Sequence, residues 1–273
     1  MPGDQRYIHG TGPAEQDRLR RLNRLTNGSF LEFLPVRPGQ RVLELGSGLG
    51  ILAGEVAARV RPGLAVGLEM SRAQIQAAQQ MEGGLHVVMG DAHAPPFREE
   101  TFDLVYCRFL LEHVHDPAAV LRAARQLLKP GGKICVQENT VLVNMFDPEC
   151  PGFDIVWKKF VELQRELRGD AMIGKQLFRL LAVADFAGIE LAIAPEVHHA
   201  GQPTYAEWIA NLAGNIESAE DALLLGRYCS RDEIQRAYDE LAALAANRRG
   251  SAWFYWNRAT AYRPHNVERE GQQ

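Results

Sequence analysis

A loop of alternating glycines follows a short apolar run near the start of the chain. Gly46, Gly48 and Gly50 come directly after Arg41–Leu45 and open a segment with helical spacing. Glycine tolerates positive φ and lets the backbone approach a ligand closely, and the N–H groups at a helix start can bind a nucleotide-like ligand. The spacing is G-x-G-x-G rather than the G-x-G-x-x-G of dinucleotide sites. We therefore expect an adenosyl-type ligand here, and the spacing disfavours NAD.

Two carboxylates follow the next two apolar runs. Glu69 ends the run Leu64–Glu69, nineteen residues after Gly50, and Asp91 comes just after the run Leu85–Met89. A carboxylate can accept two hydroxyl hydrogen bonds or one from an amino group. Glu69 is therefore expected to bind both hydroxyls of a ribose, and Asp91 an adenine amino group. The alternatives are a surface glutamate at a helix start and an aspartate that caps a turn.

The elements that must position these groups alternate between residues 40 and 140. Short apolar runs, each bounded by Gly, Pro or Asp, are separated by segments with helical periodicity, which predicts β-α units in a mostly parallel sheet. Helices are expected over the segments that contain Leu52 to Val60 and Val120 to Leu128. The predicted strands are Arg41–Leu45, Leu64–Glu69, Leu85–Met89, Phe102–Cys107 and Lys133–Gln137.

The carboxyl half has a different rhythm. Helical patterns cover much of residues 141–188 and all of 203–249, with helix starts expected at Thr204, Ser218 and Ser230. Strands are predicted at Ile189–His199 and Trp253–Tyr262, and a helix at residues 17–34. There is no internal repeat and no low-complexity linker. We therefore expect a single domain with helical insertions.

Composition sets the broad class. The 273 residues are 46% hydrophobic and 23% charged with a formal charge of −4, which excludes a disordered chain and gives no overall charge for binding nucleic acid. No apolar run approaches the roughly 20 residues that span a bilayer, and Met1 to Gly10 does not resemble a signal peptide. A cytoplasmic protein without membrane insertion is expected. Four cysteines without C-x-x-C spacing indicate reduced structural thiols rather than a zinc site, namely Cys107, Cys135, Cys150 and Cys229.

Taken together, the motifs resemble those of class I S-adenosylmethionine-dependent methyltransferases, in the small-molecule group that includes the ubiquinone/menaquinone biosynthesis enzymes. The resemblance extends from Val42 to Glu138 and fades outside that core. The segments that carry it are Val42–Gly50, Gly67–Ser71, Gly90–Ala92, Phe102–Val105, Leu111–Val114 and Leu128–Lys133.

The resemblance implies a Rossmann-like, seven-stranded α/β sheet whose last strand is antiparallel, with helices on both faces. It divides the single domain 1–273 into a helical lid (1–35), a cofactor-binding core (36–140), a helical substrate cover (141–175 and 200–250) and a C-terminal part of the sheet (176–199 and 251–263). The implied cofactor is S-adenosyl-L-methionine, with S-adenosyl-L-homocysteine as product. The residues implied to bind it are Glu44, Gly46, Ser47, Gly48 and Gly50 for the methionyl part, Glu69 and Met70 for the ribose, Asp91 and Ala92 for the adenine, Arg108 and Phe109 near the sulfonium, and Tyr7 in the lid.

His113 is the candidate general base. It lies just beyond the fourth predicted strand, and histidine is the side chain best suited to accept a proton near neutral pH. The alternative is a histidine that caps the next helix or braces the cofactor loop. Some ubiquinone-pathway O-methyltransferases carry E-x-x-E-H here and hold a divalent metal. In this chain Phe109 replaces the first glutamate, so no metal is expected.

The acceptor is less defined by the sequence. Trp157, Phe160 and Trp208 in the insertions favour a small apolar or aromatic acceptor, while the methylated atom (O, C or N) stays open. His198 and His199 are expected to end a strand rather than face the acceptor. The oligomeric state is open, a homodimer included. Two other functions compete: a nucleotide-dependent oxidoreductase or epimerase, and a catalytically silent cofactor-binding scaffold.

Overall fold

One eight-stranded sheet organises the chain. The computed structural model describes residues 12–79 and 85–265, so the lid residue Tyr7 lies outside the described part. The strand order is β3-β2-β1-β4-β5-β8-β6, with β7 paired to β8. Five neighbouring strands are parallel, as expected from the alternating pattern. They are β1 (Arg41–Leu45), β2 (Leu64–Glu69), β3 (His86–Met89), β4 (Phe102–Arg108) and β5 (Leu128–Glu138).

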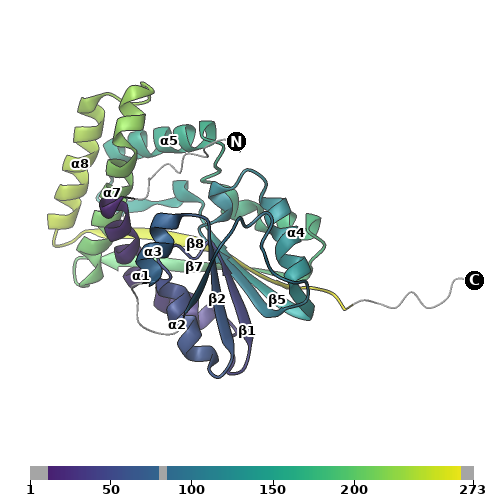
Figure 1. Ribbon diagram of the computed structural model, residues 1–273. Helices are drawn as coiled ribbons and strands as arrows, with labels where there is room; N and C mark the ends of the chain where they lie inside the picture. The colour runs from purple at the N-terminus through teal and green to yellow at the C-terminus, as the bar shows by residue number, and fades with distance from the viewer. Residues whose placement is uncertain (1–11, 80–84, 266–273) are drawn as a thin grey trace, which may run out of the picture.

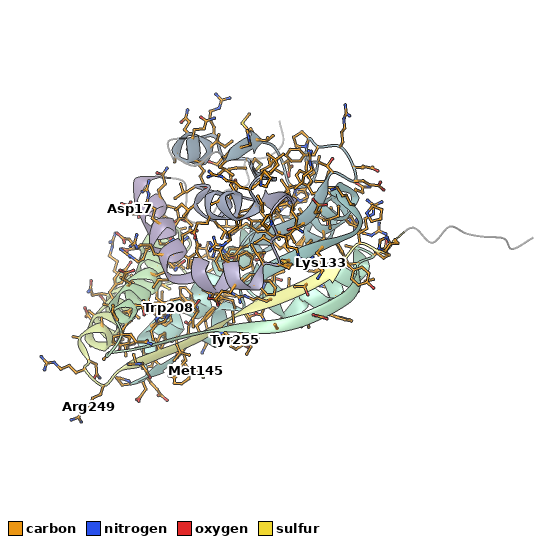
Figure 2. All side chains as sticks on the ribbon, turned by 90° about the horizontal axis from the view of Figure 1, so that it is seen from below. Asp17, Lys133, Met145, Trp208, Arg249 and Tyr255 are labelled. Carbon is orange, nitrogen blue, oxygen red and sulfur yellow. The ribbon has the colours of Figure 1, made fainter. Side chains whose placement is uncertain are left out.

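The other end of the sheet is antiparallel. Strand β8 (Ser251–Tyr262) pairs antiparallel with β5, with β7 (Ala187–His199) and with β6 (Met145–Asp147). Figure 2 shows the long strands β7 and β8 running side by side along one border of the molecule. The predicted antiparallel last strand is confirmed. The sheet has one strand more than the seven expected, because β6 adds three residues opposite Ser251–Trp253.

Helices cover both faces of the parallel strands. On one face, Val42 and Tyr106 pack with α2 and the end of α1. On the other, Leu43 and Val105 pack with α4 and α6. Successive residues of β1 thus enter opposite cores, as the period-2 geometry of a strand requires. These helices are α1 (Pro13–Phe33), α2 (Ile51–Val60), α3 (Arg72–Gln79), α4 (Pro117–Leu127) and α6 (Leu177–Val183).

Three further helices form a separate cover. Figure 1 shows α5 (Pro151–Glu166), α7 (Thr204–Leu225) and α8 (Arg231–Ala246) gathered beyond one end of the parallel strands. Their buried faces share a core with β8. Short 3₁₀ turns complete the chain: η1 (Leu111–His113), η2 (Val141–Val143) and η3 (Ile173–Gln176). No helix within the described ranges is both long and apolar enough to cross a membrane.

Not all expected helix boundaries hold. The segment 203–249 holds two helices separated by a break at residues 226–230, rather than helices with three separate starts. Ser230 begins α8 with a capping box to Glu233, as predicted. Helix α7 begins at Thr204, as predicted, although the Thr204 hydroxyl contacts His198 rather than capping the helix. The start expected at Ser218 is wrong: Ser218 lies inside α7, where its hydroxyl donates to the carbonyl of Asn215. Strand β5 begins at Leu128, five residues before the predicted strand.

Candidate active site

A cavity of about 1160 Å³ opens where the parallel strands end. Its floor is formed by residues that follow β1, β2, β3 and β4, and its walls come from α1, α5, α7 and β8. Loops at the carboxyl ends of parallel strands are the usual ligand site of open α/β sheets. The single cavity therefore joins the predicted cofactor loops to the helical cover.

The glycine loop is shaped for close approach. Gly46 has φ +69° and Gly48 has φ +54°, a region that other residues rarely adopt. A Cβ on Gly46 would lie 2.9 Å from Leu110, and one on Gly48 would lie 2.9 Å from Gln74. The N–H groups of Gly46 and Ser47 donate to the carbonyl of Leu68, which fastens the loop to β2. The cradle depends on the absence of Cβ atoms.

The Glu69 carboxylate lies directly beside this loop. Its Oε2 accepts a hydrogen bond from the N–H of Gly48 at 2.8 Å, and Oε1 accepts one from the N–H of Ser71 at 2.7 Å. Each oxygen has a second lone pair, so the carboxylate can still accept from two hydroxyls. Met70 and Ser71 line the cavity next to it.

Asp91 and Ala92 line the neighbouring part of the cavity. Asp91 Oδ1 accepts from the N–H of His93 at 2.8 Å and contacts His93 Nδ1 at 2.7 Å. The His93 ring stacks on His115, with centroids 4.1 Å apart. A pair of imidazoles thus adjoins the carboxylate predicted to bind adenine.

Glu44 is buried at the end of β1. The hydroxyl of Tyr106 donates to its Oε2 at 3.0 Å. Burial raises the pKa of Glu44 to about 8, and Arg108 and Tyr106 oppose that rise. The carboxyl therefore holds its proton near neutral pH, unless a cationic group from a ligand comes close.

Arg108 connects the cavity floor to the N-terminal helix. Its guanidinium donates to the side chains of Asn23, Thr26 and Asn27 of α1 at 2.7–3.1 Å. Burial lowers the pKa of Arg108 to about 10, so it remains a cation at neutral pH. The next residue, Phe109, has φ +57° and contacts the Trp256 ring at 4.6 Å between centroids.

His113 faces the same cavity from η1. Burial lowers the pKa of His113, because the imidazolium loses solvent; Glu112 raises it in part. The neutral imidazole is the form that can accept a proton. Its neighbour Glu112 also lines the cavity, and its carboxylate accepts from Asn139 and Gln164.

The structure gathers most of the predicted site. Gly50 is the exception among the described residues: it does not line the cavity, because it faces α3, where a Cβ would meet Leu85 and Ala78. His198 and His199 do not line the cavity either, and His198 stacks on Trp208 in the core of the cover. The residues that line the cavity as predicted are Glu44, Gly46, Ser47, Gly48, Glu69, Met70, Asp91, Ala92, Arg108, Phe109 and His113.

Sequence reasoning missed the polar residues of the cover. Asn211 lies between Trp208 and Leu212 on the buried face of α7, and Gln164 interrupts the apolar face of α5. A polar residue at an apolar position of a helix pattern was the available signal. The cavity residues contributed by α1, such as Asn23, carried no comparable signal.

The donor set suits S-adenosylmethionine. The glycine cradle would be filled by any Cβ, Glu69 offers acceptors for two hydroxyls, and Glu44 is a buried carboxyl that a ligand ammonium would pair with. The same residues show no cluster of the kind that binds a metal ion. In residues 12–79 and 85–265, no three His, Cys, Asp or Glu side chains converge as metal ligands would.

Comparison with known proteins points to methyltransferases for the segment that carries the glycine loop, Glu69 and Asp91. Residues 43–136 match the family described as methyltransferase domain. An uncharacterized transposon protein of Streptomyces fradiae is 30% identical over 218 residues, which are 78% of this chain and 61% of that protein. The ubiquinone biosynthesis O-methyltransferase of Pseudomonas aeruginosa is 41% identical over 102 residues, or 35% of this chain and 43% of that enzyme. The chain thus spans about half the length of these curated relatives.

Solved structures share the fold at low identity. An S-adenosylmethionine-dependent methyltransferase of Thermotoga maritima aligns over 95% of this chain and 100% of its own, with a TM-score of 0.58 and 17% identity. The [4+2]-cyclase SpnF aligns over 88% of this chain and 80% of its own, with a TM-score of 0.51 and 16% identity. The same fold therefore occurs in proteins named for different reactions.

The order of the parallel strands, the glycine cradle at their carboxyl ends and the family match agree with one another. Residues 43–136 match the methyltransferase domain family, and the chain as a whole has the fold of S-adenosylmethionine-dependent methyltransferases of known structure.

Proposed function

We propose that this protein transfers a methyl group from S-adenosylmethionine to a small apolar or aromatic acceptor. The observation that carries the proposal is the continuous cavity, in which the glycine cradle, Glu69 and Asp91 lie at one end and the aromatic cover at the other. When bound, the cofactor would supply a methyl group on a sulfonium, and the neutral thioether left after transfer is an intrinsically good leaving group. The chain must then mainly orient the acceptor, an effect worth roughly 7–11 kcal/mol.

The assigned roles follow the geometry of the cavity. Glu44 and the loop from Gly46 to Gly48 hold the methionyl part, Glu69 and Met70 the ribose, and Asp91 and Ala92 the adenine. Arg108 keeps α1 over the floor rather than contacting the ligand, because three α1 side chains already bind its guanidinium. Phe109 lies between that floor and the cover.

His113 is the proposed general base for an acceptor that loses a proton. It is half-buried at the junction of the cofactor loops and the cover, and its lowered pKa favours the neutral imidazole. A positioned base of this kind contributes about 10²–10⁴-fold to the rate. The aromatic wall that would hold the acceptor includes Phe109, Trp157, Phe160, Trp208, Phe254 and Trp256.

Two further properties are part of the proposal. The proposed partner is a small molecule rather than a nucleic acid, and the protein does not insert into a membrane. The apolar wall of the cavity and the formal charge of −4 support this part of the proposal. A reducing, cytoplasmic location is supported by four buried cysteines, all of them free thiols.

Thermal unfolding with S-adenosylhomocysteine, NAD⁺ and NADP⁺ in parallel tests the cofactor. Binding to the native state alone adds about 2.7 kcal/mol at 100 times the dissociation constant, which corresponds to several degrees at about 2–4 °C per kcal/mol. We expect a shift with S-adenosylhomocysteine alone. A shift with a dinucleotide alone would overturn the proposal in favour of an oxidoreductase.

The acceptor and the base are tested next. Small phenols and quinols are screened by mass spectrometry for a gain of one methyl group in the presence of S-adenosylmethionine. The variant His113→Ala should keep the shift with S-adenosylhomocysteine and lose turnover of the acceptor found. Full turnover by that variant would reduce His113 to a structural role.

A further inference from the structure

Glu112 precedes the proposed base and lies buried in the cavity wall. Only 6% of its side chain is exposed, and its Oε1 lies 3.7 Å from Nε2 of His113. The same oxygen accepts a hydrogen bond from Nδ2 of Asn139, and Oε2 accepts one from Nε2 of Gln164 at 3.3 Å. Asn139 follows β5 and Gln164 belongs to α5, so elements distant in sequence fix this carboxylate in place.

The backbone of the turn is held just as firmly. The carbonyl of Glu112 accepts from the N–H of Asp170 at 2.8 Å. A Cβ on Gly169 would lie 2.7 Å from that same carbonyl, so the close contact with the end of α5 requires glycine. On the other side, Oε1 of Glu138 accepts from the N–H groups of Leu110 and Leu111. The turn that carries Glu112 and His113 therefore has little freedom to rotate.

The charges around His113 single out Glu112. Within the described part of the chain, the other charged groups that act on the imidazole are Arg18 and Glu15, which form a two-bonded ion pair with each other at 2.7 Å. Their opposite charges largely offset one another at His113. The hydrogen bonds to Glu112 come from neutral amides, which orient its charge without neutralising it. Glu112 is thus the carboxylate available to an imidazolium at this point of the cavity.

We propose that Glu112 is a positioning residue that orients His113 and stabilises the imidazolium formed when His113 takes a proton from the acceptor. The inference rests on the proposed function. In the reaction, an acceptor lone pair forms the new bond to the methyl carbon, and the electrons of the sulfur–carbon bond return to sulfur. The acceptor proton passes to His113 and then to solvent. Glu112 exchanges no proton in this step and is held in place by Asn139 and Gln164.

The test needs neither cofactor nor acceptor. The titration of His113 is followed by NMR of the ligand-free protein, with its signals assigned from the spectrum of His113→Gln. A unit charge at 3.7 Å, even at the dielectric constant of water, changes proton affinity about seven-fold. Glu112→Gln should therefore lower the proton affinity of His113 by about seven-fold or more. The ring ¹⁵N shifts should also show the neutral proton on Nε2, beside the carboxylate, in the wild type and a mixed population in Glu112→Gln.

Matched variants separate charge from structure. Glu112→Asp keeps the charge and should titrate near the wild type, and the pair Glu112→Asp and Glu112→Asn repeats the comparison should Glu112→Gln not fold. Glu162→Gln removes a charge from the exposed side of α5 and should leave the titration unchanged. An unaltered His113 titration and tautomer in the uncharged variants would refute the role of Glu112. A failed S-adenosylhomocysteine shift, by contrast, would refute the proposed cofactor and leave this result standing.

Discussion

Between pH 4.5 and about pH 8, the ionisation of Glu44 should lower the free energy of unfolding of the wild-type protein as the pH rises. Replacing Glu44 by glutamine should remove this contribution. Burial at the end of β1 raises the pKa of Glu44 from 4.5 to about 8. The folded chain therefore binds this proton more tightly than the unfolded chain does. The stabilisation is fully present below pH 4.5 and is lost as the pH rises through the folded-state pKa.

The size of the effect follows from the two pKa values. A difference of about 3.5 units corresponds to about 5 kcal/mol over the whole range, at 1.36 kcal/mol per unit. Between about pH 5.5 and pH 7.5, both inside the window, the wild type should lose about 2.7 kcal/mol from this group. Glutamine fills the same space and can still accept from Tyr106, but it does not titrate.

Urea unfolding of both proteins at these two pH values measures the effect. At each pH, the free energy of unfolding of wild type is subtracted from that of Glu44→Gln, and the two differences are compared. The other titrating groups, including the buried Glu138, are present in both proteins, so their contributions cancel in each difference. We expect the variant to gain about 2–3 kcal/mol relative to wild type on going to the higher pH. An equal difference at both values would mean that Glu44 is ionised in the folded chain, and the reasoning from burial would be wrong.

Three further predictions concern the glycine loop, the ribose site and the cover. Gly48→Val should abolish stabilisation by S-adenosylhomocysteine, whereas Gly54→Val in α2, where a Cβ has open space, should retain it; equal behaviour of the two would place the ligand elsewhere. Glu69→Ala should weaken S-adenosylhomocysteine binding in calorimetry by up to roughly 1.5–3 kcal/mol for each charge-assisted bond lost, and unchanged affinity would contradict the ribose assignment. Ser230→Ala removes the capping box of α8 and should cost about 0.5–2 kcal/mol in urea unfolding; Ser218→Ala, inside α7, serves as its control and should cost less.

Most of the residues predicted to bind the cofactor line one cavity, for a physical reason. Positive φ at Gly46 and Gly48 and carboxylates at strand ends are local requirements, so they leave local traces in the chain. The parallel order of the sheet followed from the alternation of apolar runs with helical patterns. Gly50 does not line this cavity, because its positive φ serves close packing against Ala78 of α3 and Leu85.

The acceptor half could not be predicted in the same way. Glu112 meets Gln164 across 52 residues, and the contact depends on how α5 is placed beside the turn η1. The motif S/T-x-x-E/D predicted the start of α8 at Ser230 but misplaced one at Ser218, since nothing in that motif excludes the interior of a long helix. Pairwise meetings of distant segments are set by tertiary packing, which a single sequence does not display.

The hydrogen bonds from Arg108 to α1 show that the matched domain depends on residues outside it. The family match ends at residues 43 and 136, yet the buried guanidinium within it is satisfied by Asn23, Thr26 and Asn27 from outside those limits. Excising the matched segment would remove the three α1 side chains that accept from this guanidinium, together with the α1 residue Phe30 that covers it. The segment that matches the family, residues 43–136, is therefore smaller than the segment needed to keep the floor of the cavity intact, which includes α1. A graft of this site onto another scaffold would have to bring the polar face of α1 with it.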